Sequence, residues 1–433
     1  MNPLPEHLSL TPDHHLAIGG VDTVELAKEY GTPLFVYDIA TVRTNIRAFK
    51  KAFEANQVDY NIAYASKAFS CLAVYEVINQ EEIAVDVVSG GELYTAIQAD
   101  VPAKNIHFHG NNKSKEELEL ALEYGVGCYI VDNFYEIELL NQVAADYDTI
   151  VTVQLRIAPG FSAHTHDFIR TGQRDSKFGF DLENGQALEA IKRVLSMDNL
   201  NLHGLHCHIG SQIFESEAFA LAAEKLMCFL ADIRLETDFV AKSLNLGGGF
   251  GIKYTDQDQV TSIQAHIDAV CRRTKELANT YNYPLPEIWV EPGRSIVGAA
   301  ALTLYTIGSK KNIHGIRNYL AVDGGMTDNI RPALYQAKYQ GLLANRAAEE
   351  NQELYSIAGK CCESGDMLIW DLPLPYVETN DLLAVLSTGA YGYSMASNYN
   401  RLPRPAVVFV EEGQARLAIR RETYQDLIDL DYR

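Results

Sequence analysis

Residues 59–69 read Asp59-Tyr60-Asn61-Ile62-Ala63-Tyr64-Ala65-Ser66-Lys67-Ala68-Phe69. This short, mostly apolar run reaches a lysine where a predicted strand ends. Strand neighbours would desolvate the stem of Lys67 and favour its neutral form, which attacks carbonyl groups to make Schiff bases. Lysines with buried stems and solvated tips are common, so Lys67 alone is a weak indication of chemistry. The rest of the chain strengthens this indication, because most of the other apolar runs also end in polar or glycine residues.

Apolar runs of strand length recur along the first two thirds of the chain. They are Asp59–Ser66, Ile83–Ser89, Asn105–Gly110, Gly127–Asp132, Val151–Pro159, Leu202–Ile209, Ser243–Gly247 and Ile288–Glu291. Near-continuous apolar character is typical of parallel strands whose outer side is covered. Helix-like stretches lie between most of them. Alternating strands and helices in eight units predict an α/β fold, a (β/α)8 barrel of the TIM type.

Two of the intervening stretches carry clear helix signals. Ser114-Lys115-Glu116-Glu117 has the pattern of a capping box and opens one predicted helix. Residues 184–195 form another, with Leu188, Ile191 and Leu195 on one face.

The pattern changes after about residue 297, where short strand-like runs separated by turns replace the alternation. These runs are Ala300–Ile307, Tyr319–Val322, Leu354–Ala358, Leu382–Ser387, Ala406–Glu411 and Ala415–Arg420, with Leu8–Ile18 and Pro33–Tyr37 near the N-terminus. Glu412-Gly413 is a plausible hairpin turn between the last two. We expect residues 38–297 to form the barrel, and residues 1–37 and 298–433 to form a second, mostly β domain.

Composition limits the class of protein. The chain has 433 residues and a formal net charge of −21, which argues against nucleic acid and anionic membrane partners. The sequence shows neither a run of transmembrane length nor a signal peptide. Seven cysteines without framework spacing indicate a reducing compartment, so we expect a cytoplasmic protein.

Polar and glycine residues gather where the predicted strands end. They are Lys67, Ser89-Gly90-Gly91, His109-Gly110-Asn111, Asp132-Asn133, Arg156, His206, His208, Ser211, Gly247-Gly248-Gly249 and Glu291-Pro292-Gly293-Arg294. The carboxyl ends of barrel strands form the active-site mouth in this architecture. Packing alone does not account for such a concentration, so these residues are candidates for the site.

Two of these motifs suit an anion. Gly247-Gly248-Gly249 exposes backbone N–H groups and permits positive φ, as a phosphate cradle requires, although such a run is also common in tight loops. The loop after the seventh strand is a recurrent phosphate site in barrels, which favours the phosphate interpretation. In Glu291-Pro292-Gly293-Arg294, Gly293 adds an amide and Arg294 a guanidinium, with a surface salt bridge as the alternative.

Two histidines allow a metal interpretation, which the sequence supports poorly. His206 and His208 could share a zinc ion, but no third ligand stands nearby in sequence, and stacking or hydrogen bonding explains them as well. We therefore expect no metal. Cys361-Cys362 lies in the predicted β domain, where a cysteine is most often a small buried hydrophobe.

Taken together, the motifs resemble the fold-type III pyridoxal-phosphate-dependent decarboxylases over essentially the whole chain. The stretches that carry the resemblance are Tyr64–Ala68, Ser89–Glu92, His206–Gln212, Gly247–Gly249, Glu291–Arg294, Cys362–Asp366 and Ala390–Tyr393. The resemblance implies an alanine-racemase-like barrel, pyridoxal 5'-phosphate as cofactor, an amino acid as substrate, and a homodimer in which the β domain reaches the partner's active site.

The resemblance also implies a role for individual residues. Lys67 would hold the cofactor covalently, His208 would stack on its ring, Glu291 would face the ring nitrogen, and Cys362 would donate a proton. Further cofactor contacts would come from Ser211, Gly248, Gly249, Pro292, Gly293, Arg294 and Tyr391. Substrate contacts would come from Arg294, Arg331, Tyr335, Glu363 and Tyr391.

The chemistry fits these assignments. A glutamate at the ring nitrogen keeps it protonated and suits decarboxylation, whereas an arginine there would suit racemisation. An arginine together with a glutamate reads both charges of an amino-acid head group, which favours a substrate with such a group at each end. The expected reaction turns meso-2,6-diaminopimelate into L-lysine and CO2. The alternatives are related decarboxylases acting on ornithine, arginine, lysine or carboxynorspermidine, a racemase, and a non-catalytic homologue.

Overall fold

The eight expected apolar runs form a closed, parallel β-barrel in the computed structural model, which describes residues 4–161 and 176–432. The strands are β5 (Tyr60–Ala65), β6 (Ala84–Val87), β7 (Ile106–Phe108), β8 (Cys128–Val131), β9 (Val151–Ala158), β11 (Leu200–Cys207), β12 (Ser243–Asn245) and β13 (Glu287–Val290). They pair in chain order, and the β9–β8 and β13–β5 pairings close the ring. The short β10 (Phe180–Asp181) adds to the outside of β9. The predicted fold class is confirmed.

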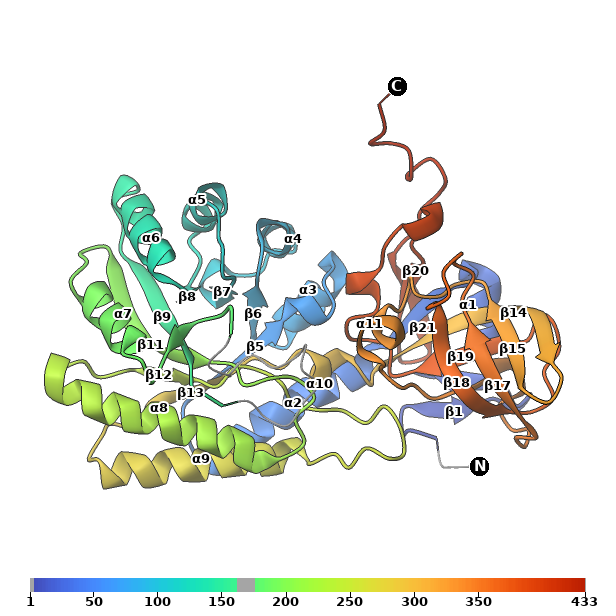
Figure 1. Ribbon diagram of the computed structural model, residues 1–433, viewed down its shortest axis with the longest axis horizontal. Coiled ribbons are helices and arrows are strands. Elements are labelled where there is room, and N and C mark those ends of the chain that lie inside the picture. The colour runs from blue at the N-terminus through green and yellow to red at the C-terminus, as the bar shows by residue number, and fades with distance from the viewer. Residues whose placement is uncertain (1–3, 162–175, 433) are drawn as a thin grey trace. The chain divides into compact units, whose positions relative to one another are not determined.

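Helices alternate with the strands and surround the barrel (Figure 1). They are α2 (Ile39–Asn56), α3 (Leu72–Gln80), α4 (Gly90–Gln98), α5 (Lys115–Tyr124), α6 (Phe134–Asp146), α7 (Gln186–Leu195), α8 (Ser216–Thr237) and α9 (Ile263–Thr280). The capping box at Ser114 is confirmed, with both reciprocal hydrogen bonds to Glu117 in place. Within the described residues, no helix is long and apolar enough to cross a membrane.

The face of α7 formed by Leu188, Ile191 and Leu195 is not the one that packs. Ile191 is buried as expected, but Leu188 is only partly covered and Leu195 is exposed. The face that packs consists of Ala187, Ala190, Ile191 and Val194. Alanine has little side-chain volume, so a face containing two alanines lets the helix approach the barrel closely, and the larger leucines lie at its margin.

The strand-like runs of the C-terminal third form a separate sheet together with one N-terminal strand. Its members are β4 (Leu34–Asp38), β14 (Ala301–Ile313), β15 (Arg317–Val322), β16 (Gly341–Leu343), β17 (Glu353–Ala358), β18 (Met367–Leu374), β19 (Leu382–Leu386), β20 (Ala406–Glu411) and β21 (Gln414–Ile419). The main path runs β18-β17-β15-β14-β4-β20-β21, while β19 pairs with β14 and β16. The β20–β21 hairpin turns at Glu412-Gly413, as predicted, with both residues at positive φ.

The predicted strand Leu8–Ile18 is two strands. β1 (Leu8–Leu10) and β2 (Leu16–Ile18) pair antiparallel across a turn, and β3 (Val21–Asp22) completes a small sheet before α1 (Thr23–Tyr30). His14 takes a left-handed conformation in the turn, with φ of 61°.

The chain divides into two compact units. The barrel unit comprises Ile46–Gly251 and Val260–Gly293. The β unit comprises the residues up to Asn45, the segment Ile252–Gln259 and the residues from Arg294 onward, so that the chain crosses between the units four times.

Candidate active site

Lys67 lies directly beyond β5, in a 3-10 turn formed by Ser66–Ala68. Its neighbours Ser66 and Ala68 are buried, whereas Lys67 itself is exposed. The residue as a whole is therefore accessible just beyond the strand end, where the sequence placed it. The turn is joined to the end of β13, since the Ala65 amide donates to the Pro292 carbonyl over 3.1 Å. Lys67 thus stands beside the start of the Pro292-Gly293 turn.

Glu291 follows β13 and is buried at the end of the barrel, with 5% of its surface exposed. Asn245 Nδ2 donates to its Oε1 over 2.7 Å, and His206 Nε2 lies 3.1 Å from Oε2. His109 Nε2 lies 2.9 Å from Oε1. Burial alone would raise the pKa of Glu291, but the two imidazoles hold it well below its usual value.

The hydrogen-bond partners of Glu291 leave its carboxylate the capacity to accept from one more donor. A carboxylate can accept about four hydrogen bonds, and three neighbouring side chains occupy part of that capacity. Burial lowers the pKa of His206, so a neutral imidazole that donates from Nε2 is the form compatible with the site. An ionised Glu291 can therefore hold a pyridinium N–H by a charge-assisted hydrogen bond.

His208 lies on the adjoining loop and faces the glycine run. The amide of Gly248 donates to His208 Nδ1 over 3.2 Å, which fixes the ring's orientation. Burial, followed by the charges of Lys67 and Arg156, holds the pKa of His208 well below its usual value. A neutral imidazole of fixed orientation is suited to packing against a planar ring.

The structure separates the two histidines that the sequence paired. His206 points to Glu291 and His208 to Gly248, so the pair does not form the metal site that we considered. The group with ligand atoms within 4.8 Å of one another is instead His109, His206 and Glu291. His109 and Asn245 had no assigned role in the sequence; His109 was marked only by its position at a strand end, and Asn245, inside a predicted strand, carried no signal.

The glycine run has space for backbone only. An added Cβ would come within 2.2 Å of the Glu291 carbonyl at Gly248 and within 2.4 Å of the Gly210 carbonyl at Gly249. Gly247 and Gly249 also have positive φ, 68° and 107°. Ser211 lies on the loop that the Ile213–Gly249 hydrogen bond ties to this run. The Gly249 amide and the Ser211 hydroxyl are thus carried by two joined loops next to His208, a donor set suited to a phosphate.

These features fit pyridoxal phosphate. The glycine cradle suits the phosphate, the fixed His208 ring suits a planar heterocycle, and the ionised Glu291 suits a protonated ring nitrogen. The barrel unit brings together Lys67, His208, Ser211, Gly248, Gly249, Glu291, Pro292 and Gly293.

The β unit holds two buried arginines around one tyrosine. Arg294, which opens α10 (Arg294–Val297), donates to the Tyr254 hydroxyl over 2.5 Å, and the Arg331 guanidinium lies 4.9 Å from the centre of the Tyr254 ring. Arg331, which opens α11 (Arg331–Tyr335), donates to the Tyr339 hydroxyl over 2.6 Å. Arg294 also lies 4.8 Å over the ring of Tyr391. Two guanidiniums fixed in one aromatic setting can bind an anionic group.

Tyr254 and Tyr339 were missed in the sequence. Tyr254 holds Arg294, forty residues away, and Tyr339 holds Arg331, eight residues away; tyrosines of this kind carry no local motif. Tyr335 is half-buried at the end of α11.

Cys362 and Glu363 are exposed in the loop between β17 and β18. Cys361 beside them is buried, and burial raises its pKa to about 11. The two cysteines therefore differ sharply in access, and Cys362 is the one whose side chain is exposed.

The fold and the two groups of residues define a class of enzyme, the pyridoxal-phosphate-dependent decarboxylases built on a barrel. The family model described as "Pyridoxal-dependent decarboxylase, pyridoxal binding domain" matches residues 39–298. The diaminopimelate decarboxylase of Bacillus subtilis (strain 168) is 58% identical over 417 residues, which are 96% of this chain and 95% of that protein. The diaminopimelate decarboxylase of Staphylococcus aureus (strain COL) is 47% identical over 95% of this chain and 96% of that protein.

Solved structures agree. A crystal structure of the diaminopimelate decarboxylase from M. jannaschii in co-complex with L-lysine has a TM-score of 0.92 and 35% identity, covering 99% of this chain and 98% of that chain. The lysine/ornithine decarboxylase of Vibrio vulnificus, at 21% identity and a TM-score of 0.77 over 93% of this chain and all of that one, shares the fold. The chain belongs to the pyridoxal-dependent decarboxylases and, within them, to the diaminopimelate decarboxylase family. It is a pyridoxal-phosphate-dependent enzyme.

Proposed function

We propose that the enzyme removes CO2 from meso-2,6-diaminopimelate and releases L-lysine, the last step of lysine biosynthesis by the diaminopimelate route. The observation that carries the reaction type is Glu291, a buried carboxylate kept ionised by His109 and His206. An ionised carboxylate favours a protonated ring nitrogen, which suits decarboxylation. The substrate is supported by the names of relatives up to 58% identical to this chain.

Each residue has a distinct task in this proposal. Lys67 holds the cofactor covalently, Ser211 and the backbone of Gly248 and Gly249 hold its phosphate, and His208 orients its ring. The backbone at Pro292-Gly293, together with Arg294 and Tyr391, completes the contacts. Bound pyridoxal phosphate supplies an electron sink for the electron pair that departing CO2 leaves on carbon.

Cys362 returns the proton. Its Sγ–H protonates the carbon that lost CO2, and the resulting thiolate takes a proton from solvent, so one proton replaces one CO2 in the product.

The charged groups at the far end of the substrate are bound by side chains of opposite charge. In the proposal Arg294 and Arg331 take its carboxylate and Glu363 its ammonium, with Tyr335 and Tyr391 at the side. The two arginines already stand together around Tyr254, which supports an anion there.

Replacing Arg331 with alanine should lower kcat/KM for diaminopimelate. One lost charged hydrogen bond costs about 1.5–3 kcal/mol, or roughly ten- to a hundredfold. Lysine should stay a poor substrate for the wild type. Rates are to be measured with both substrates, with Arg272→Ala, an exposed arginine on α9, as the matched control. Equal efficiency of the wild type on lysine and diaminopimelate would assign the chain to the lysine- or ornithine-type decarboxylases.

The active sites are shared across a homodimer in our proposal, with Cys362 and Glu363 serving the partner's barrel. Supporting this, both residues are exposed on a loop of the β unit, whereas Lys67 belongs to the barrel unit. We further propose a cytoplasmic enzyme, in line with seven free cysteines.

Mixing inactive Lys67→Ala with inactive Cys362→Ala should restore activity. Random exchange gives half hybrid dimers, each with one intact site, so about a quarter of wild-type activity is expected. Exchange is monitored by mass spectrometry of intact dimers. A mixture that stays inactive although hybrids form would place both residues of each site on one chain.

Product analysis tests the whole proposal. Purified enzyme with pyridoxal phosphate and meso-diaminopimelate should release lysine and CO2 in equal amounts. Ornithine, arginine and carboxynorspermidine are the comparison substrates, and faster CO2 release from any of them would contradict the assignment.

A further inference from the structure

The loop that carries Cys362 is fixed at its base by Asp366. This buried carboxylate accepts hydrogen bonds from the Cys361 amide over 2.8 Å and from the Met326 amide over 2.6 Å. Gly359 lies against it so closely that an added Cβ would come within 2.1 Å of Asp366 Oδ2. These contacts hold the loop on the β unit, but they act on Cys361 and not on Cys362.

Cys362 itself is held by a residue far along the chain. Its backbone amide donates to Asn400 Oδ1 over 2.8 Å. Asn400 and Arg401 both take left-handed conformations, with φ of 53° and 56°. Asparagine tolerates this region, whereas arginine rarely adopts it, so the surrounding contacts must hold the segment. The backbone that bears the Cys362 thiol is thus aimed by a strained turn.

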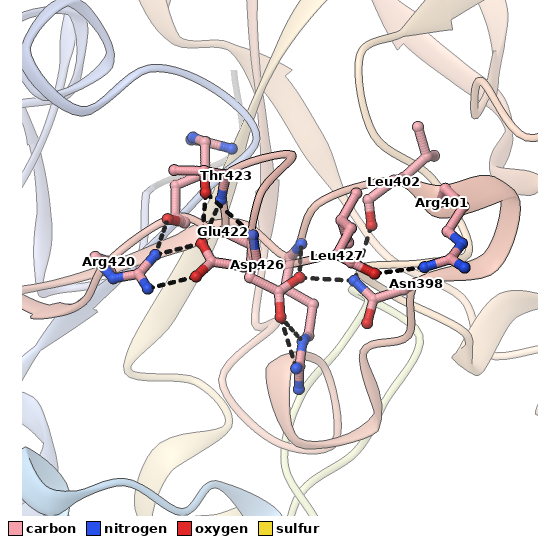
Figure 2. A network of polar contacts seen from close by, with 10 residues as sticks. Asn398, Arg401, Leu402, Arg420, Glu422, Thr423, Asp426 and Leu427 are labelled. Atoms are coloured by element: carbon pink, nitrogen blue, oxygen red, sulfur yellow. Dashed lines mark hydrogen bonds and ion pairs between the residues drawn. The ribbon is translucent and has the colours of Figure 1, made fainter. Parts of the chain in front are cut away.

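Glu422 clamps both ends of that turn. Asn398 Nδ2 donates to Glu422 Oε2 over 2.6 Å, and Arg404 donates from Nε to Oε1 over 2.8 Å and from its amide to Oε2 over 2.8 Å (Figure 2 shows Asn398 and Glu422). Partial burial would raise the pKa of Glu422, but the hydrogen bonds from Arg404 and Asn398 hold it below its usual value. The carboxylate therefore stays charged and the clamp closed at neutral pH.

Arg401 is tied to the same C-terminal segment. Its guanidinium donates to the Leu427 carbonyl and contacts Asp431 Oδ2 over 2.8 Å. The segment is folded on itself by a bidentate pair between Arg420 and Asp426, with distances of 2.6 and 2.7 Å (Figure 2). Single exposed ion pairs contribute little, but bidentate geometry and a shared network make the arrangement more rigid.

We propose that Asn400 is a positioning residue for Cys362, and that residues 420–431 hold Asn400 in place. This rests on the proposed function, in which Cys362 gives its proton to the substrate carbon. Asn400 touches only the backbone of Cys362, so it acts through the direction of the thiol and not on the substrate.

The test compares holoenzymes carrying Asn400→Ala, Asn400→Asp and the matched control Asn312→Ala, an exposed asparagine on β14. The first readout is deuterium exchange at the Cys362 amide. Losing its acceptor in Asn400→Ala should speed exchange roughly five- to tenfold, while Asn400→Asp keeps an acceptor and should retain protection. Asn312→Ala should exchange like the wild type.

The second readout separates kcat from KM with diaminopimelate. Asn400→Ala should lower kcat about tenfold and leave KM within about twofold, because Glu363, the substrate contact on the same loop, keeps its own backbone hydrogen bonds with Cys361 and Asp366. Glu422→Ala should also speed exchange at Cys362, though less. Wild-type exchange in Glu422→Ala would overturn the role of the C-terminal segment.

The outcomes separate this proposal from the function beneath it. If Cys362→Ala is inactive while Asn400→Ala matches the control in exchange and kcat, only the positioning role is overturned. If Cys362→Ala keeps full turnover, the proton-donor assignment falls, and the positioning role falls with it.

Discussion

Lys67→Ala will fail to form a covalent adduct with pyridoxal phosphate and will lose at least about 10³-fold in kcat, which corresponds to about 4 kcal/mol of transition-state stabilisation. The physical reason is that an alanine offers no nucleophile at the strand end, where the turn of Ser66–Ala68 adjoins Pro292. Non-covalent binding should persist through the glycine cradle, so the variant should still retain cofactor on a desalting column.

Borohydride reduction of the wild type, followed by peptide mapping, checks the assignment. The reduced cofactor should be found on Lys67. Lys104→Ala, which removes an exposed lysine of the same unit, should behave like the wild type. A reduced adduct on any other lysine would refute the role of Lys67.

Glu291→Gln should keep the cofactor and slow decarboxylation by roughly 10²-fold, or about 2.7 kcal/mol. A glutamine cannot hold a pyridinium by a charge-assisted hydrogen bond. Its amide would also present a donor to Asn245, His206 or His109, which themselves donate to the present carboxylate. Turnover and the absorption spectrum of the bound cofactor are the measurements.

Glu287→Gln on the opposite end of β13 is the matched control, because it makes the same chemical change on the same strand. Near-normal turnover of Glu291→Gln would mean that another group faces the ring nitrogen.

The lowered pKa of Glu291 also sets how the stability of the fold depends on pH. The carboxylate stabilises the fold above its ordinary pKa of about 4.3, and this contribution is lost only as the pH falls through the lower folded value.

The barrel strands were predictable because apolar runs alternate with helix-like stretches along the sequence. Their carboxyl ends were placed too far along, as in β7, where the predicted Asn105–Gly110 is Ile106–Phe108. The polar residues just beyond each strand belong to the candidate site and are not paired in the sheet. The run predicted from the sequence therefore ends later than the paired strand does.

Strand β18 was missed for a different reason. Its sequence includes Asp371, which has φ of 53°, and Pro373, and both are turn residues in most settings. β18 lies at the edge of its sheet, where a proline and an irregular residue are tolerated because one side needs no partner. Edge position is a property of the folded sheet and leaves little trace in the local sequence.

The motifs of the candidate site could be picked out in the sequence, but the residues that support them could not. Glu291 stands in a recognisable motif, whereas its partners His109 and Asn245 come from two other strands. Tyr254 likewise contacts Arg294 and Arg331 only in the folded chain. Side chains that orient another residue can come from any element that reaches it, so sequence spacing does not reveal them.

The central place of β4 sets a limit on how the chain can be made. Leu34–Asp38 is buried between residues 301–304 of β14 and residues 406–410 of β20. At ribosomal rates of ~5–20 residues per second, β4 waits on the order of tens of seconds for its last partner. During that interval β4 is an apolar strand with unpaired edges and can pair with non-native segments. The emerging chain is therefore expected to bind chaperones. Expression at a lower temperature or with extra chaperone should therefore raise the yield of folded protein.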